Sequence, residues 1–445
     1  MKKRFNKKGN IMVFLTSILM SMVMLSMVFV QAARDVCGAS YSDAVLEVAG
    51  RSVLAEFDRR LKDEYGIFAF HGREDTVESK IRFYADASFT KSLPGEVPIG
   101  MKYFYGNKFV MDVLRLKLQK VNVCLTEYAL IDIDMFEDQI VDHVYYLIAE
   151  KGRDFIKDRW SGKPAKKANP KGADKVLKSE AEINNLPSHN NTTKGIDFSF
   201  LKAKEVPLLE TLIDKGMRKF VVDEYIMSHF QYNIGGGKDK AAFFRNEVEY
   251  ILFGKLSDED NLDTFKFDFV ILRTLLNFFY LEFNEDKGNI ISAAVKRGGP
   301  VGVAVQGLIY AAWARVEAEN DVRLLLAGKN VALFKSDDTW ALDLKKAVKI
   351  KPVKEEREIV DYNIEDKTIK KYVSPTSDKG YSYAAYIRLF LFFEKRDTKL
   401  LRVMDLIQLN LRGSYYKDFL IKEHFTGFSM SAVVSGKKFE YEQKY

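Results

Sequence analysis

Hydrophobic positions are densest near the start of the chain, where residues 9–33 contain no charged side chain. Five basic residues precede this run, and Arg34 follows it at once. A helix rises about 1.5 Å per residue and the hydrocarbon layer of a bilayer is about 30 Å thick, so residues 11–30 are long enough to cross it. Because basic flanks stay in the cytoplasm, the pattern predicts a single-pass membrane protein whose chain lies outside from Arg34 onward.

Two other interpretations of the apolar run stay open. Residues 30–32 end in a small residue and form a candidate cleavage site for a secretory signal before Ala33, although the apolar region of such signals is usually only about 7 to 15 residues long. Gly9 and Asn10 form the other candidate leader-processing position, because a prepilin-type leader is a short basic peptide that ends in glycine.

An apolar residue recurs at every fourth position after the run: Val45, Ala49, Val53, Phe57, Leu61 and Tyr65. No proline interrupts this stretch, so we expect one helix to continue from the membrane to the exterior, as in pilins. Since a helix has 3.6 residues per turn, the stripe winds slowly around it. An ordinary amphipathic helix that packs on its own domain is compatible with the same pattern.

Alternation with period two predicts strands at two places. Residues 113–128 alternate between apolar and polar positions, and the phase changes at Lys120, which indicates a β-bulge or a break between two strands. The tail alternates through residues 428–434, turns at Ser435 and Gly436, and resumes at Phe439, which predicts a terminal hairpin.

Helical periodicity covers most of the remaining apolar segments, at 132–160, 206–230, 265–283, 300–326, 381–393 and 400–411. The expected fold class is α+β: an N-terminal transmembrane helix that continues into a long pilin-like helix, then an extracytoplasmic domain of helices and antiparallel strands. The predicted segments are a basic cytoplasmic tail at 1–9, a transmembrane signal-anchor at 10–33, an extracytoplasmic long helix, strands and amphipathic helix at 34–157, a disordered basic linker at 158–196, and a mainly helical part with the hairpin at 197–445.

A net charge of +7 is compatible with a nucleic-acid partner, but the position of the charges argues against one. Five of the surplus charges lie in the tail, and residues 151–178 hold ten Lys or Arg against three Asp, so the remainder of the chain carries −5. Nucleic-acid binding needs basic residues on a folded face. We therefore predict no nucleic-acid partner.

Cys37 and Cys124 are the two cysteines of the sequence, and either one disulfide between them or two free thiols is compatible with it. The five histidines are scattered without metal-ligand spacing, so we predict no metal and no cofactor.

The best candidate for a catalytic acid pair is Glu317 with Asp321, because residues four apart share one helical face and their carboxyl groups can lie about 6 Å apart. Arg315 and Arg323 are close enough in sequence to neutralise them, which favours a structural pair. Residues 258–263 are acidic but lack the central glycine of a calcium loop. The glycines at 235–237 lack the spacing of a phosphate loop and predict a turn.

Several segments resemble an uncharacterised family of exported proteins from clostridial-type bacteria: the run 9–15, then 49–58, 65–69, 247–255, 313–321, 326–329 and 404–408. That family is a domain of unknown function whose members resemble components carried beside tight-adherence (Tad) pilus machinery, comparable to the TadE and TadG pseudopilins. The resemblance implies assembly instead of catalysis. Processed pilins commonly have Glu at the fifth mature position, where this chain has Phe14, which favours a retained anchor.

The combined hypothesis is a non-catalytic, surface-exposed pseudopilin-like or accessory component of a Tad-type pilus or secretion apparatus, located in the cell membrane. Expected partners are the lipid bilayer, other pilus or membrane assembly proteins, and anionic wall polymers through the basic linker. The alternative is a membrane-anchored enzyme or binding module that acts on cell-wall or surface polymers.

Overall fold

The computed structural model describes residues 7–89, 114, 116–151, 183–189, 209–234, 242–295, 302–344, 372–377 and 379–445. The chain forms two compact units. Unit 1 comprises Met1–Lys62, Phe68–Met135 and Lys422–Tyr445, and unit 2 comprises Asp63–Ile67 and Phe136–Ile421. Most of the predicted linker at 158–196, together with the glycines at 235–237, lies outside the described residues.

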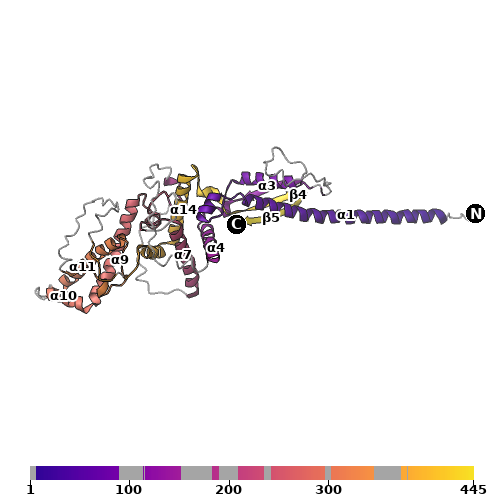
Figure 1. Ribbon diagram of the computed structural model, residues 1–445. Coiled ribbons are helices and arrows are strands. Elements are labelled where there is room, and N and C mark those ends of the chain that lie inside the picture. Colours follow the sequence, from indigo (N-terminus) through magenta and orange to yellow (C-terminus); the bar gives the residue numbers. More distant parts are fainter. Residues whose placement is uncertain are drawn as a thin grey trace, which may run out of the picture. The chain divides into compact units, whose positions relative to one another are not determined.

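Helix α1 (Lys7–Leu54) is 48 residues long and is the spine of unit 1. Within the described residues, it is the helix that is long and apolar enough to span a membrane. The other elements of unit 1 lie along its C-terminal part, and the N-terminal part extends beyond them (Figure 1). The predicted helix across the apolar run is confirmed.

The expectation that this helix runs on through the whole four-residue stripe is wrong. Helix α1 ends at Leu54, and a second helix, α2 (Arg59–Tyr65), starts after a turn. The Asp58 carboxylate accepts hydrogen bonds from the backbone N–H groups of Arg60 and Leu61, at 2.8 and 3.0 Å. Asp58 therefore caps α2, because it satisfies amide groups that have no partner inside the helix.

The sheet of unit 1 is antiparallel, with strand order β2-β4-β5, where β2 is Leu118–Cys124, β4 is Gly427–Val434 and β5 is Lys437–Lys444. The pairing of β2 with β4 shifts between Leu118 and Lys120, which confirms the bulge that the change of phase predicted. Two shorter strands, β1 (Phe70–His71) and β3 (His424–Phe425), pair separately.

The terminal hairpin is confirmed. Ser435 and Gly436 have positive φ angles of 49° and 83°, as a two-residue turn with the twist of a hairpin requires. Apolar residues alternate on the inner face of the sheet and pack with α1 and α3 (Glu74–Phe89) in one core. That core includes Val45, Leu46, Ala49, Val53, Val77, Ile81, Val121, Val123, Phe428, Met430 and Ala432.

Unit 2 is built from helices. They are most of α4 (Ile133–Lys151), α7 (Leu209–His229), α8 (Glu247–Phe253), α9 (Asp258–Phe283), α10 (Glu285–Val295), α11 (Gly302–Leu326), α13 (Tyr383–Phe393) and α14 (Arg396–Ser414). The predicted helices are confirmed within the described residues, with shifted ends at α9, α13 and α14, while the predicted ends at 152–160, 206–208 and 300–301 lie outside the described residues. Helix α9 starts before its apolar residues because Ser257 Oγ accepts the Asp260 N–H at 3.2 Å, and acidic residues in a first turn suit the helix dipole. The α+β fold class is therefore confirmed.

Candidate functional site

The structure places four charged side chains together in the interior of unit 2, between α9 and α11. Arg273 Nε donates to Asp321 Oδ2 at 3.0 Å, and Lys335 Nζ donates to Asp321 Oδ1 at 2.6 Å and to Glu317 Oε1 at 2.8 Å. A further bond runs from Arg273 to the Leu333 carbonyl at 2.6 Å. The charged side chains are 0–2% exposed, so two cations neutralise two anions in the interior of unit 2.

The backbone that follows α11 completes the hydrogen bonding of this charge cluster. Both carboxylate oxygens of Glu317 accept backbone N–H groups, from Ala341 at 2.9 Å and Leu342 at 3.0 Å. Lys335 Nζ also donates to the Thr339 carbonyl at 2.9 Å. A buried charge is tolerated only when it is paired and hydrogen-bonded. The cluster therefore fastens the segment after α11 to the helix pair.

The predicted acid pair is thus buried and neutralised, as expected of a structural pair, but Arg315 is not one of the cations that neutralise it. Arg315 lies on an exposed face and pairs with Glu319 at 3.4 Å, whereas Arg273 and Lys335 neutralise the pair. Burial raises the pKa of the Glu317 carboxyl, and the nearby Lys335 opposes that shift. A sequence signal for this arrangement is Arg273, which is the one charged residue in the stretch 269–281 of α9.

A second buried carboxyl, Glu249 on α8, has an incomplete set of hydrogen bonds. Its Oε1 accepts from the Tyr383 hydroxyl and from the Asn233 N–H, the latter at 3.0 Å, whereas Oε2 has no hydrogen-bond partner among the described residues. Burial raises the pKa of Glu249 to about 7, although those two donors lower it. Glu249 therefore holds a proton over part of the neutral range.

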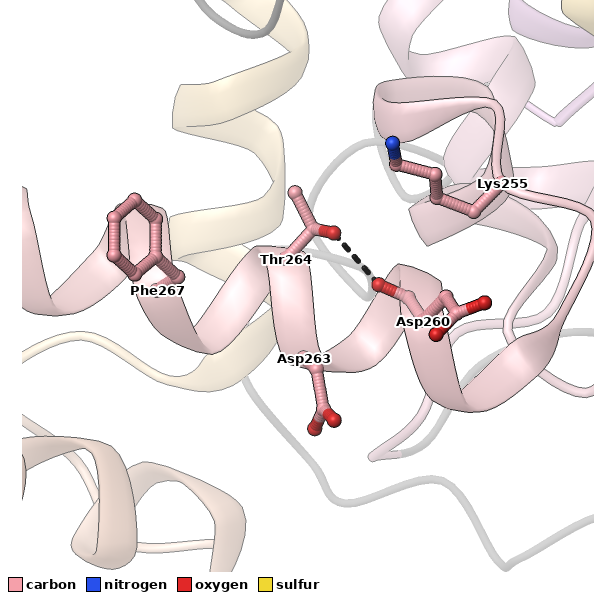
Figure 2. Close-up of a pocket in the computed structure, with 5 residues that line it drawn as sticks. All are labelled: Lys255, Asp260, Asp263, Thr264 and Phe267. Carbon is pink, nitrogen blue, oxygen red and sulfur yellow. Dashed lines mark hydrogen bonds between the residues drawn. The ribbon is translucent and has the colours of Figure 1, made fainter. Parts of the chain in front are cut away.

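Figure 2 shows a pocket beside the first turns of α9, lined by Lys255, Asp260, Asp263, Thr264 and Phe267. Thr264 Oγ1 donates to the Asp260 carbonyl at 2.7 Å, and Asp263 pairs with Lys266 at 2.7 Å. The Asp263 carboxylate points away from Asp260 and Lys255 (Figure 2), so the two acids do not converge on one point. The pocket offers no acid–base pair, but its Phe267 belongs to a larger apolar surface.

That surface is a row of exposed apolar side chains, which we call the α9 ladder: Phe267, Ile271, Leu275, Phe279 and Phe283. They are 41–80% exposed and recur every four residues, over about 24 Å of helix. The buried row of the same helix contains Arg273 and Asn277. Helix α9 thus has apolar side chains on two faces, because Phe265, Phe269 and Leu281 are buried while the ladder is exposed, whereas a surface helix of a soluble domain usually has one apolar face. Contiguous exposed apolar patches mark interaction sites.

The candidate disulfide between Cys37 and Cys124 is not formed, because both thiols are free and exposed. Cys37 is next to Gly38, which lies near Leu116, whereas Cys124 is at the far end of β2. Leu118 and Cys124 are six residue steps apart along the strand, about 20 Å, while a disulfide requires Cα atoms within about 7 Å. Gly9 and Asn10 lie in the first turn of α1, and processing there stays a prediction.

Tertiary structure brings four of the five histidines into two pairs that the sequence did not suggest. The ring centroids of His143 and His229 lie 5.3 Å apart, and those of His71 and His424 lie 5.4 Å apart. Even so, no group of three metal-ligating side chains occurs among the residues that the structure describes.

Replacing the shared cation of the charge cluster should destabilise unit 2 strongly. In Lys335→Met, Glu317 loses its cation and Asp321 keeps only Arg273, so we expect the free energy of unfolding to fall by about 3–5 kcal/mol. The matched control Arg315→Met removes an exposed i,i+4 pair and should cost about 0–1 kcal/mol. Denaturant unfolding followed by fluorescence of the buried Trp313 and Trp340 measures both. Equal effects of the two variants would contradict the role of the cluster.

Glu249 should make stability depend on pH. Its pKa is raised from 4.5 in the unfolded chain to about 7 in the folded protein, so the folded state disfavours ionisation. Stability is fully present below pH about 4.5 and is lost as pH rises through about 7, by about 3 kcal/mol in total. Gln at this position cannot ionise, so Glu249→Gln should lack this pH dependence. The unfolding free energy of the parent, relative to that of the variant, should therefore fall by about 3 kcal/mol between pH 4.5 and 8. A constant difference across this range would disprove the assignment.

Residues 158–436 match a protein family described as Family of unknown function (DUF5702). The match covers more than half of the chain, from the predicted linker through β4, and it confirms the expectation of a family without an established function. No curated protein and no solved structure matches the chain. This chain therefore belongs to the DUF5702 family of proteins of unknown function.

Proposed function

We propose that this protein is a single-pass membrane protein, exposed at the cell surface, that acts in the assembly of a Tad-type pilus or secretion apparatus and not as a catalyst. Helix α1 carries the proposal. Sixteen large apolar side chains between Ile11 and Val30 are 45–74% exposed, on every side of the helix. Burying each one contributes about 1.5–3 kcal/mol, so water is a poor environment for this segment and a bilayer core is a suitable one.

The position of Arg34, the first charged residue after the apolar run, supports the same proposal. Arg34 ends the uncharged run, and it is also where α1 begins to contact the rest of unit 1, through a hydrogen bond to the Leu114 carbonyl. The helix therefore changes surroundings at the point where its composition changes. A pilin-like protein needs this division, because one half of its helix crosses the membrane and the other half packs in the folded domain.

The α9 ladder supports assembly as the role of unit 2. Exposed acidic residues lie at both ends of it, Glu259 and Asp260 at one end and Glu282, Glu285 and Asp286 at the other. A second copy of α9 would bring acidic ends together in either orientation, which is unfavourable. The fitting occupant is an amphipathic helix of another assembly protein, with a matching apolar row and basic residues at both ends.

The alternative of an anchored enzyme had Glu317 and Asp321 as its candidate acids. Both are fully buried and bonded to cations, so a wall polymer has no access to them. Wall binding through the basic linker at 158–196 stays a separate proposal.

Charges in the centre of the apolar run should abolish anchoring. We expect the full chain in the membrane fraction after a carbonate wash, with an intact N-terminus, and Leu19→Arg combined with Val23→Arg to move it to the soluble fraction, because each arginine costs about 2.5–3.5 kcal/mol at a bilayer centre. The matched control, Val36→Arg with Val48→Arg, changes equally exposed positions of α1 beyond the run and should stay in the membrane. Soluble parent protein that begins at Ala33 would refute the anchor, and an N-terminus at Asn10 would indicate prepilin processing.

A photo-crosslinking residue in place of Phe279 should identify the partner of the α9 ladder. In cells that express the full chain naturally, we expect a crosslink to a helix of another protein that has an apolar row and basic ends. Leu275→Asp should weaken the crosslink at least about tenfold, because it places a charge in an apolar interface. The same crosslinker at the exposed Arg315 is the control. Crosslinks to a second copy of this chain or to lipid would contradict the assignment.

A further inference from the structure

Unit 1 gathers basic residues at the end from which α1 projects alone (Figure 1). We call Arg34, Lys117, Lys437 and Lys438 the basic collar. The three lysines are exposed, and Arg34 is half-buried. They come from α1, from the residue before β2, and from the start of β5, so segments far apart in the sequence converge here.

Hydrogen bonds fix the collar to α1. Lys437 Nζ donates to the Asp35 carbonyl at 2.9 Å, which places the β4–β5 turn against the helix one residue beyond Arg34. The same turn is joined to Lys117, since the Ser435 N–H donates to the Lys117 carbonyl at 3.0 Å and the Lys117 N–H donates to Ser435 Oγ at 3.2 Å. The collar therefore has a defined height along the helix.

That height coincides with the headgroup layer of a bilayer spanned by α1. Arg34 lies four residues beyond Val30, or about 6 Å along the axis. The headgroup region adds about 5–8 Å on each side of the hydrocarbon core. The collar consequently lies at the level of lipid phosphates when residues 11–30 occupy the core.

Acidic neighbours offset only part of the charge of the collar. Glu440 pairs with Lys438, and the Asp35 carboxylate, which accepts a hydrogen bond from Gln31 at 3.1 Å, lies beside Arg34. Lys120 in the bulge of β2 adds a further exposed cation near this end. Basic residues thus outnumber acidic ones at the surface that meets the lipid.

We propose that the basic collar binds anionic phospholipid headgroups and so holds unit 1 against the bilayer surface. The proposal rests on the membrane anchor of the proposed function, since α1 sets the height of the collar. Each lysine or arginine near an anionic membrane strengthens attraction about fivefold, so the collar should favour anionic over zwitterionic lipid neighbours.

The two native cysteines allow a test with the full chain. Cys37 lies one turn beyond Arg34, and Cys124 lies at the opposite end of β2, so a donor fluorophore on each reports a different height. Two single-cysteine variants of the full chain are reconstituted in phosphatidylcholine vesicles: Cys124→Ser, which keeps the donor on Cys37, and Cys37→Ser, which keeps it on Cys124. The vesicles contain traces of acceptor-labelled phosphatidylglycerol or acceptor-labelled phosphatidylcholine. We expect energy transfer from Cys37 to the anionic acceptor to exceed transfer to the zwitterionic one.

Removing the collar lysines should remove this excess. Lys117→Gln, Lys437→Gln and Lys438→Gln together should lower the preference for phosphatidylglycerol at least about tenfold. The matched control neutralises three exposed cations of unit 1 away from the collar, Arg73→Gln, Lys422→Gln and Lys444→Gln, and should keep the preference. Lys438→Gln alone should lower the preference for phosphatidylglycerol by an intermediate amount, and it leaves the hydrogen bond from Lys437 to the Asp35 carbonyl intact.

The outcomes separate the collar from the anchor. An undiminished excess in the triple variant, an equal excess from Cys124, or displacement of the lipid by dilute inorganic phosphate would overturn the proposal. Transfer from Cys37 to neither acceptor would mean that α1 does not insert, which is a failure of the proposed function and not of the collar alone.

Discussion

The continuity of α1 is the constraint on which the rest of the protein depends. A single helix passes without a break from a segment that water disfavours on every side to a segment that supplies Val45, Leu46, Ala49 and Val53 to the core of unit 1. Because a helix satisfies its own backbone hydrogen bonds, it can cross hydrocarbon and then enter a protein core without a change of conformation. In the proposed arrangement, a rigid helix and not a flexible linker therefore joins the membrane to unit 1.

Helix α9 of unit 2 is held in place by polar as well as apolar contacts. Its buried row includes Arg273 and Asn277, so the helix is held to α11 by hydrogen bonds and charge pairing as well as by Leu281. Phe265 and Phe269 of the same row contact aromatic rings of α13. A buried ion pair adds little net stability, but it is specific in geometry, because any slippage would leave a charge unpaired. Pairing of this kind fixes the position of α9 along α11, which suits a helix whose apolar row faces outward.

Local patterns predicted much of the fold. The change of phase at Lys120 predicted the bulge in β2, the Ser435–Gly436 turn predicted the last hairpin, and periodicity predicted the helices. The error at Asp58 is also local: a side chain that caps a helix N-terminus lies in the middle of an apolar stripe, and the stripe alone does not show the break. Here hydrogen bonding to the backbone prevailed over apolar periodicity.

The sequence by itself determined the apolar run, its basic flank, the α+β class and the acid pair of Glu317 and Asp321, because each depends on composition or on residues a few positions apart. Only the tertiary structure decided which cations neutralise that pair, which face of α9 is exposed, and that the last hairpin joins the N-terminal helix. These features depend on contacts between residues tens to hundreds of positions apart, as between Lys437 and Asp35. The free energy of such contacts comes from burial and pairing, which periodicity along one segment does not encode.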